Sequence, residues 1–177
     1  MASSSKPSLL VITTGGTIDK DYPRTTGGHA FEFGETSAAQ RILSSLPQMA
    51  YDVRIESVCA KDSLEMCEEQ RIAITAAIRN SSAQHIVITH GTDTMIETAR
   101  YVLSSCKPGV HTVVFTGAAK PERFKDSDAS FNLGAAIAAV GLLPRGSVAI
   151  CMGGLVIGAM ECTRTADGTF ILEHEKA

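Results

Sequence analysis

The sequence has no tryptophan, and aromatic residues make up only 5% of its 177 residues. Its apolar stretches are far shorter than the roughly 18 residues that a membrane-spanning helix needs. The N-terminal residues MASSSKPS also lack the apolar core of a signal peptide. We therefore expect no association with a membrane, and we predict that the protein resides in the cytoplasm.

Basic residues are not in excess either. The 16 Lys and Arg residues face 19 Asp and Glu residues, which gives a net charge of −3 and a pI near 5.9. A chain with this balance has no general attraction for nucleic acid or anionic lipid, so we predict no nucleic-acid partner. A local basic group, Lys120, Arg123 and Lys125, could still bind an anion.

The cysteines show no pattern of disulfides or metal ligands. There are five of them, an odd number, with no CxxC pair and no matching histidine spacing. This usage predicts reduced, mostly buried thiols, as is typical of a reducing compartment. It predicts no metal site.

Apolar runs alternate with longer segments of helical period. The runs are continuously apolar, which is typical of parallel strands covered on both faces. Each intervening segment is long enough to connect two parallel strands. The sequence therefore predicts a single α/β domain with a doubly wound, mainly parallel sheet and helices on both faces. The predicted strands are 9–13, 53–58, 85–89, 111–116 and 147–152, and the predicted helices are 37–46, 67–80, 94–105 and 128–141.

Polar residues follow the predicted strands. The segments TTGGT, AKDS, THGTDT and TGAAKP come directly after the first four strands. In open parallel sheets ligands bind at the carboxyl ends of the strands, beside the point where the strand order reverses. With the strand order 2-1-3-4-5, Thr14 would face Thr92 and Asp93 at this edge.

The same residues have purely structural interpretations. Asp62 with Glu65, and Thr94 with Glu97, have the spacing of a helix capping box. The pair Gly15–Gly16 could serve only a tight turn. In addition, TTGGTI is not the G-x-G-x-x-G pattern and THGTDT is not a Walker A loop, so dinucleotide and P-loop binding gain little support.

The chemistry of a threonine-rich strand end suits acyl transfer. A threonine hydroxyl is a poor nucleophile until a base or a nearby charge assists the loss of its proton. An aspartate, a fixed cation and backbone N–H donors to a developing oxyanion would together promote attack on an amide. Among the histidines, His90 is the best placed, and we interpret it as a residue that orients the loop.

The segments ITTGGTI and ITHGTDTM resemble the two signature motifs of the bacterial-type L-asparaginase family, amidohydrolases that cleave asparagine to aspartate and ammonia. AKDS, TGAAKP and DASFNL follow the family's order, so the resemblance covers nearly the whole chain. It implies that residues 1–177 form the family's N-terminal catalytic domain, with a flavodoxin-like sheet and with residues 1–8 flexible. It also implies that no metal or organic cofactor is needed.

The resemblance also assigns roles to residues. Thr14 matches the family's nucleophile, and Thr92 and Asp93 match its second catalytic threonine and the acid that also holds the substrate's α-amino group. Tyr22 is the candidate for the tyrosine of the mobile loop, although only seven residues separate it from Thr14, fewer than usual. Ala60 stands where the family usually has a serine. The expected substrate-binding residues are Gly15, Ala60, Lys61, Asp62, Gly91, Thr92, Asp93 and Ala118.

Two features depart from the family's pattern. Arg164 stands where the family has its catalytic lysine, and an arginine stays charged and cannot act as a base. The chain also ends at Ala177, whereas the usual enzymes continue into a C-terminal domain that completes a neighbouring subunit's site. The resemblance thus implies a short, single-domain branch or a chain cut at the domain boundary. It also implies a homo-oligomer, dimer or tetramer, that rebuilds the missing wall.

We interpret the sequence as an amidohydrolase that acts on a small-molecule amino-acid amide, with Thr14 as nucleophile and Thr92, Asp93 and Arg164 as its activating group. One alternative is a catalytically impaired relative that binds an amino acid or a partner protein. A second is a flavodoxin-like phosphate or nucleotide binder. The residues do not distinguish asparagine from glutamine as the substrate.

Overall fold

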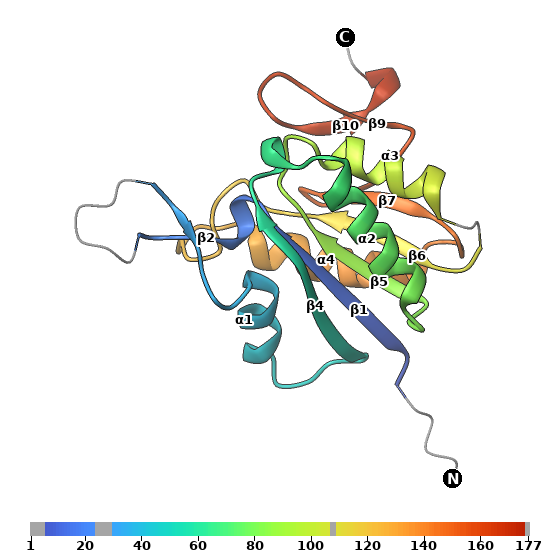
Figure 1. Ribbon diagram of the computed structural model, residues 1–177, viewed down its shortest axis with the longest axis horizontal. Helices are drawn as coiled ribbons and strands as arrows, with labels where there is room; N and C mark the ends of the chain where they lie inside the picture. The colour runs from blue at the N-terminus through green and yellow to red at the C-terminus, as the bar shows by residue number, and fades with distance from the viewer. Residues whose placement is uncertain (1–5, 24–29, 107–108, 176–177) are drawn as a thin grey trace.

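A six-stranded sheet forms the centre of the computed structural model, which describes residues 6–23, 30–106 and 109–175 (Figure 1). Five strands run parallel, and the sixth lies antiparallel at one edge. Across the sheet they follow in the order β4 (Asp52–Lys61), β1 (Ser8–Gly15), β5 (His85–Thr89), β6 (Thr112–Thr116), β7 (Val148–Met152) and β8 (Leu155–Gly158).

In the described part of the chain, two helices cover each face of the sheet. In β1, Leu10 and Ile12 pack into the core under α2 (Glu68–Asn80) and α3 (Met95–Ser105), while Leu9 and Val11 pack into the core under α1 (Ala38–Ser45) and α4 (Ala129–Leu142). Successive side chains of a strand point to opposite faces, so a strand buried on both faces must be apolar at every position. The predicted fold, an α/β domain with a flavodoxin-like, mainly parallel sheet, is confirmed.

The predicted strand order is also confirmed. The five predicted strands correspond to β1, β4, β5, β6 and β7, and β1 lies between β4 and β5 as the order 2-1-3-4-5 requires. Several short elements were not predicted, because two to four residues carry no usable hydrophobic period. These are β8, the hairpins β2 (Lys20–Asp21) with β3 (Glu32–Phe33) and β9 (Cys162–Arg164) with β10 (Phe170–Leu172), and the 3₁₀ turns η1 (Thr17–Asp19), η2 (Ser63–Glu65) and η3 (Glu173–Glu175).

The helix-cap predictions are confirmed only in part. The Asp62 carboxylate accepts a hydrogen bond from the backbone N–H of Leu64 at 3.1 Å, so it caps η2. Thr94 does not cap α3, because its hydroxyl donates to the carbonyl oxygen of Ser63 at 2.7 Å. Thr94 therefore ties the loop after β5 to the turn after β4 instead of closing its own helix.

All five cysteines are unpaired. Cys151 and Cys162 are buried, Cys59 and Cys106 are half-buried, and Cys67 is exposed, so the expectation of mostly buried thiols is confirmed only at Cys151 and Cys162. Burial raises the pKa of the Cys162 thiol to about 11. Across the described residues, no helix combines the length and the apolar character that crossing a membrane requires.

The chain segments that follow β1, β4, β5 and β6 meet at one side of the sheet, which we call the carboxyl edge. In Figure 1 the hairpin β2–β3 projects at the left of this edge, and the hairpin β9–β10 lies above it. Asp19, in the segment after β1, is buried, and its carboxylate accepts a 2.6 Å hydrogen bond from Ala38 N at the start of α1. Burial raises the pKa of this carboxyl group.

Two glycines allow the segment after β1 to approach its neighbours. Gly15 and Gly16 have positive φ angles, 92° and 79°, which favour glycine. A Cβ on Gly15 would lie 2.5 Å from Lys61 N, and a Cβ on Gly16 would overlap with the backbone of Gly91. The Gly16 N–H also donates to the Lys61 carbonyl oxygen at 2.8 Å. Backbone groups of three strand ends are therefore in direct contact.

This packing predicts that Gly16→Ala destabilises the protein strongly. The alanine would adopt an unfavourable positive φ, which costs about 1 kcal/mol, and would also force the backbone of Gly91 to move, so we expect a total loss of about 3 kcal/mol or more. Gly109→Ala is the matched control, because Gly109 has φ 80° but no atom of the described residues beyond its chain neighbours would lie within 4 Å of its Cβ. It should lose only about 1 kcal/mol in urea unfolding. Equal losses in the two variants would contradict the proposed contact.

Candidate functional site at the carboxyl edge

Thr14 is the penultimate residue of β1 and is fully buried. Its hydroxyl donates a hydrogen bond to the carbonyl oxygen of Thr89, the last residue of β5, at 2.8 Å. The side chain therefore lies between two adjacent strand ends. Because a carbonyl oxygen does not take up a proton, this hydrogen bond orients the hydroxyl without activating it.

Arg164 and Asp93 form an ion pair at the same edge. The guanidinium Nη1 lies 2.7 Å from Asp93 Oδ1, and Arg164 Nε donates to the Gly168 carbonyl oxygen at 3.1 Å. The guanidinium also lies over the ring of Phe170, 5.7 Å from its centroid. Arg164 ends β9, so the β9–β10 hairpin delivers this cation to the loop that follows β5. The sequence prediction brought these two residues together, and the structure does the same.

The loop between β5 and α3 carries Gly91, Thr92 and Asp93. Gly91 is buried against the side chain of Ser63, Thr92 is half-buried, and Asp93 is exposed. Among the described residues, no hydrogen bond joins the Thr92 hydroxyl to the Arg164–Asp93 pair. The loop therefore places the predicted catalytic threonine and acid at one edge, with only the acid engaged by the cation.

Asp62 is engaged as well, by a residue that sequence reasoning missed. Lys20 Nζ lies 2.7 Å from Asp62 Oδ2, and both side chains are partly buried. The hydrogen bond from Lys20, together with the one from Leu64 N, lowers the pKa of the Asp62 carboxyl group. Lys20 begins the short strand β2, and a lone lysine in a turn carries no sequence signal that separates it from an ordinary surface charge.

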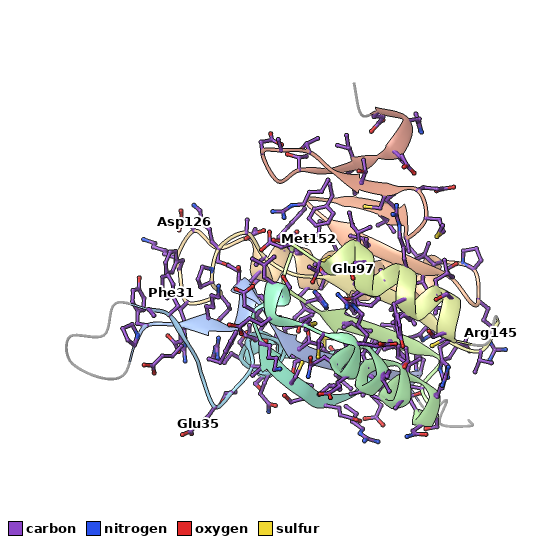
Figure 2. All side chains as sticks on the ribbon, turned by 45° about the horizontal axis from the view of Figure 1, so that its top comes forward. Phe31, Glu35, Glu97, Asp126, Arg145 and Met152 are labelled. Carbon is purple, nitrogen blue, oxygen red and sulfur yellow. The ribbon has the colours of Figure 1, made fainter. Side chains whose placement is uncertain are left out.

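Tyr22 lies in an aromatic cluster and not beside the Arg164–Asp93 pair. Its ring stacks on Phe124, with centroids 5.7 Å apart, and packs at 5.9 Å against Phe31, which Figure 2 labels at the left of the molecule. Its side chain is 60% exposed. Among the described residues, no hydrogen bond links its hydroxyl to Thr14. In this structure Tyr22 therefore holds the β2–β3 hairpin against the loop after β6.

The remaining predicted binding residues occupy the ends of β4 and β6. Ala60 and Lys61 are the last two residues of β4, and Ala118 is buried in a small core with Ile18. Ala60 also lines a recess of about 380 Å³ beside β1. That recess opens on the face toward which Thr13, not Thr14, points. Its lining includes Thr13, Asp19, Cys59 and Ala60.

The basic group that could bind an anion is largely neutralised. Lys120 forms an ion pair with Asp126, and Arg123 Nε lies 2.9 Å from Asp21 Oδ2. Among the described residues, no group of three histidine, cysteine, aspartate or glutamate side chains is arranged to hold a metal ion. Neither feature adds an anion or metal site to the carboxyl edge.

His90 stands between Thr89 and Gly91 and is fully buried. Its Nδ1 lies 2.7 Å from the Gly91 carbonyl oxygen, and its ring packs edge-on against Phe115. A carbonyl oxygen can only accept, so Nδ1 carries the hydrogen and Nε2 is a buried acceptor without a partner among the described residues. Burial lowers the pKa of His90 from 6.5 to about 4. A neutral, wedged ring fits a role in orienting the loop.

Comparison with known proteins assigns the family. The family model described as "Asparaginase, N-terminal" matches residues 8–170, a range that contains every predicted site residue. The chain belongs to the asparaginase family. It is 31% identical over 166 residues to a probable periplasmic L-asparaginase of Haemophilus influenzae, covering 90% of this chain and 47% of that protein.

Other asparaginase relatives carry different names. A glutamyl-tRNA(Gln) amidotransferase subunit of Archaeoglobus fulgidus is 32% identical, over 84% of this chain and 35% of its own length. The solved structure of a probable cytoplasmic L-asparaginase from Campylobacter jejuni superposes with a TM-score of 0.77 at 25% identity, covering 93% of this chain and 52% of that one. The chain therefore spans about half or less of the length of these relatives.

The burial of His90 predicts a specific dependence of stability on pH. In the unfolded chain the imidazole takes up a proton as the pH falls below 6.5, while in the folded protein it stays neutral down to about pH 4. The free energy of unfolding should therefore be highest above pH 7 and fall as the pH drops through this window. The loss approaches 1.4 kcal/mol per pH unit and on the order of 3 kcal/mol in total.

Urea unfolding between pH 7.5 and 5.5 measures this effect, because ordinary carboxyl groups titrate below that range and the raised pKa of buried Asp19 acts in the opposite direction. His90→Gln should flatten the dependence, whereas His174→Gln, which changes an exposed histidine near the C-terminus, should leave it as in the wild type. A wild-type protein whose stability does not change over these two pH units would contradict a buried neutral His90.

Proposed function

We propose that this protein hydrolyses the side-chain amide of L-asparagine, or of a related amino-acid amide, to the acid and ammonia. Thr14 acts as the nucleophile. Membership of the asparaginase family supports amide hydrolysis as the reaction class. The name of a relative from Acinetobacter glutaminasificans, a glutaminase-asparaginase that is 27% identical, adds L-glutamine as a second substrate to test.

The observation that carries the proposal is the meeting of a buried strand-end threonine and a charged pair at one edge. Thr14 lies at the end of β1, and Asp93 with its 2.7 Å partner Arg164 belongs to the loop after the neighbouring strand β5. The contact of Gly16 with Gly91 joins the two segments. A nucleophile, an acid and a fixed cation at one strand-end edge suit attack on an amide carbon.

In the proposed reaction, Thr14 Oγ1 attacks the amide carbon, and the tetrahedral intermediate expels ammonia to leave an ester on Thr14. Water then hydrolyses that ester to release the acid. The hydroxyl must first exchange its bond to the Thr89 carbonyl oxygen for one to a proton acceptor. Arg164 remains protonated, so it contributes positive charge and orients Asp93, and Thr92 with Asp93 carries the proton from Thr14 Oγ1 to the leaving nitrogen.

A non-catalytic amino-acid binder is the second candidate, and the fixation of Arg164 favours it. The guanidinium is bound to Asp93 and to the Gly168 carbonyl oxygen and is packed on Phe170. A group held in this way cannot relay a proton as a neutral lysine could. The pairing of Lys120 and Arg123 with acids gives the phosphate or nucleotide alternative no comparable support.

The proposal also covers the oligomeric state of the protein and the cell compartment in which it resides. We expect a homo-oligomer, dimer or tetramer, because exposed apolar side chains gather on the edge strand β8 and beside it, at Leu155, Val156 and Phe131. We expect cytoplasmic residence because all five cysteines are free thiols.

Removal of the Thr14 hydroxyl tests the proposal. Thr14→Ala should lower kcat for amide hydrolysis by at least about 10³-fold, because no other hydroxyl replaces the attacking oxygen. The lost hydrogen bond to Thr89 should cost only about 1–3 kcal/mol of stability, so the variant should remain folded. Ammonia release from L-asparagine and L-glutamine gives the activity, and circular dichroism reports the fold.

Thr13→Ala is the matched control. Thr13 is the neighbouring buried threonine of the same strand, 2% exposed, and its side chain points to the opposite face of the sheet. This variant should keep kcat within about tenfold of the wild type, as expected for a residue outside the chemistry. A Thr14→Ala variant as active as Thr13→Ala would refute the nucleophile.

Substitution of Arg164 separates charge from proton relay. If fixed charge is sufficient, the wild type hydrolyses amides and Arg164→Lys changes kcat by about tenfold, or 1.4 kcal/mol, because the positive charge beside Asp93 is kept. Arg164→Met removes that charge and should lower kcat much further. The measurement is ammonia release between pH 6 and 10. An inert wild type that Arg164→Lys activates by several orders of magnitude would instead support the non-catalytic relative.

A further inference from the structure

Strand β4 forms one edge of the sheet, and β1 is its only partner among the described strands (Figure 1). It is the longest of the described strands, with 10 residues, and it contains no proline. None of its residues is buried, whereas every residue of β6 and β7 is buried. A long edge strand of this kind is a template on which another strand can pair.

The outward backbone groups of β4 have no partner within the described part of the chain. The Asp52 N–H donates to the Pro7 carbonyl oxygen at 2.9 Å, so the backbone of Asp52 faces β1. Backbone groups alternate in direction along a strand, so those of Val53, Ile55 and Ser57 point away from the sheet. No described residue forms a hydrogen bond with them. The edge therefore presents donors and acceptors at three alternate positions.

Two charges of opposite sign lie side by side on one face of β4. Arg54 and Glu56 point to the face covered by α2, because their register partners in β1 are Leu10 and Ile12. They form an ion pair at 2.8 Å, and their side chains are 75% and 34% exposed. An exposed pair of this kind contributes little to the stability of one chain. Both side chains remain accessible to a neighbouring molecule.

The sequence of β4 is complementary to itself about Ile55. In an antiparallel pairing of two β4 strands centred on Ile55, Arg54 of each copy lies opposite Glu56 of the other. The outward-facing residues Val53, Ile55 and Ser57 then form the hydrogen-bonded pairs. Arg54 and Glu56 fall in the non-hydrogen-bonded positions, where opposed side chains come closest. The four charges alternate in sign around the two-fold axis.

The two neighbouring registers lack this match. A pairing centred on Arg54 would set Arg54 opposite its own copy and Glu56 opposite Asp52. A pairing centred on Glu56 would set two Glu56 carboxylates opposite each other. Like charges directly opposite each other destabilise a sheet. Lys61, at the far end of β4, lies beyond the overlap of the two strands. The charge pattern therefore favours the register centred on Ile55.

There is room for a second strand beside β4. On one face, a groove of about 490 Å³ separates β4 from α2. The α2 side chains that line this groove are short and uncharged, and they are Ala73, Ala76, Ala77 and Asn80. On the opposite face, Ile55 and Ser57 line the recess of about 380 Å³ that also contains Thr13. Both faces of β4 are thus open next to its outer edge.

We propose that β4 is a dimerisation edge, through which two copies of this chain pair by antiparallel β4 strands centred on Ile55 and form one continuous sheet. Such a contact uses the same surface on both subunits, so it closes as a two-fold dimer. The proposal goes beyond the amidase function and does not depend on it. It concerns the edge of the sheet opposite to β8.

Charge reversal on β4 tests the pairing. Glu56→Arg would set arginine opposite arginine at both charged pairs, and Arg54→Glu would set glutamate opposite glutamate. Each variant should raise the dissociation constant of the dimer at least about tenfold, measured by sedimentation over a dilution series. The double variant, Arg54→Glu with Glu56→Arg, restores opposite charges and should return the constant to within about threefold of the wild type. Circular dichroism checks the fold of each variant.

Two control variants locate the effect. Arg145→Glu reverses an exposed charge in the turn before β7, which three strands separate from β4, and it should leave the dissociation constant unchanged. Val156→Arg changes the opposite edge strand, β8. It should leave the β4 dimer intact, although it removes any larger assembly built through β8.

Hydrogen exchange gives an independent readout that needs no variant to be dimeric. The amide protons of Val53, Ile55 and Ser57 should exchange at least about tenfold more slowly in the wild type than in Glu56→Arg, because only the dimer holds them in hydrogen bonds. A wild type that stays monomeric at micromolar concentration, with these amides exchanging freely, overturns the proposal. So does an oligomer that Val156→Arg dissociates and Glu56→Arg does not. A double variant that fails to recover overturns the register centred on Ile55.

Discussion

The contact of the Gly15–Gly16 turn with the backbones of Lys61 and Gly91 is the constraint on which the site depends. Parallel strands bring their carboxyl ends to one side of a sheet, but side chains normally keep the following loops apart. Here the absence of two Cβ atoms lets three strand ends touch. Thr14 is consequently fixed against Thr89, and the loop that carries Asp93 is fixed beside the turn that carries Asp62. A residue larger than glycine at either position would push these strand ends apart.

The main architecture could be predicted because burial on both faces leaves a strong trace in the sequence. Leu9 to Ile12 face two different cores, so every position must be apolar, and the same holds for β5, β6 and β7. The strand order came with the expectation of a flavodoxin-like sheet, in which the first strand lies between the second and the third. The pairing of Arg164 with Asp93 came from the family resemblance, since 71 residues separate the two and no local pattern connects them.

Other parts of the site could not be predicted, for physical reasons. In the sequence, Lys20 cannot be distinguished from an ordinary surface lysine, because only the folded chain brings Asp62 beside it. The sequence suggests that Asp19 is an ordinary polar turn residue. In the structure it is buried, and its carboxylate accepts a hydrogen bond from the backbone N–H of Ala38 at the start of α1. Tyr22 was assigned by position after Thr14, but it packs with Phe31 and Phe124, two residues that the chain alone does not place near it. Contacts between distant residues decide each of these outcomes.

The two acids of the carboxyl edge, Asp62 and Asp93, are already paired with cations within the protein. Pairing holds the loops in place and lowers the pKa of Asp62, and it also means that a ligand must rearrange existing contacts. An arginine in the place of a lysine fits this arrangement, because its planar, permanently charged head can bind Asp93, a backbone carbonyl oxygen and an aromatic face together.

The central claim is that a substrate's amide carbon lies at Thr14. The most direct measurement is a crystal structure of the protein soaked with L-aspartate, the product of asparagine hydrolysis. We predict that the side-chain carboxyl carbon lies within about 3.5 Å of Thr14 Oγ1, as required for attack. An L-aspartate molecule bound on the other face of β1, in the recess lined by Thr13 and Asp19, would contradict the claim.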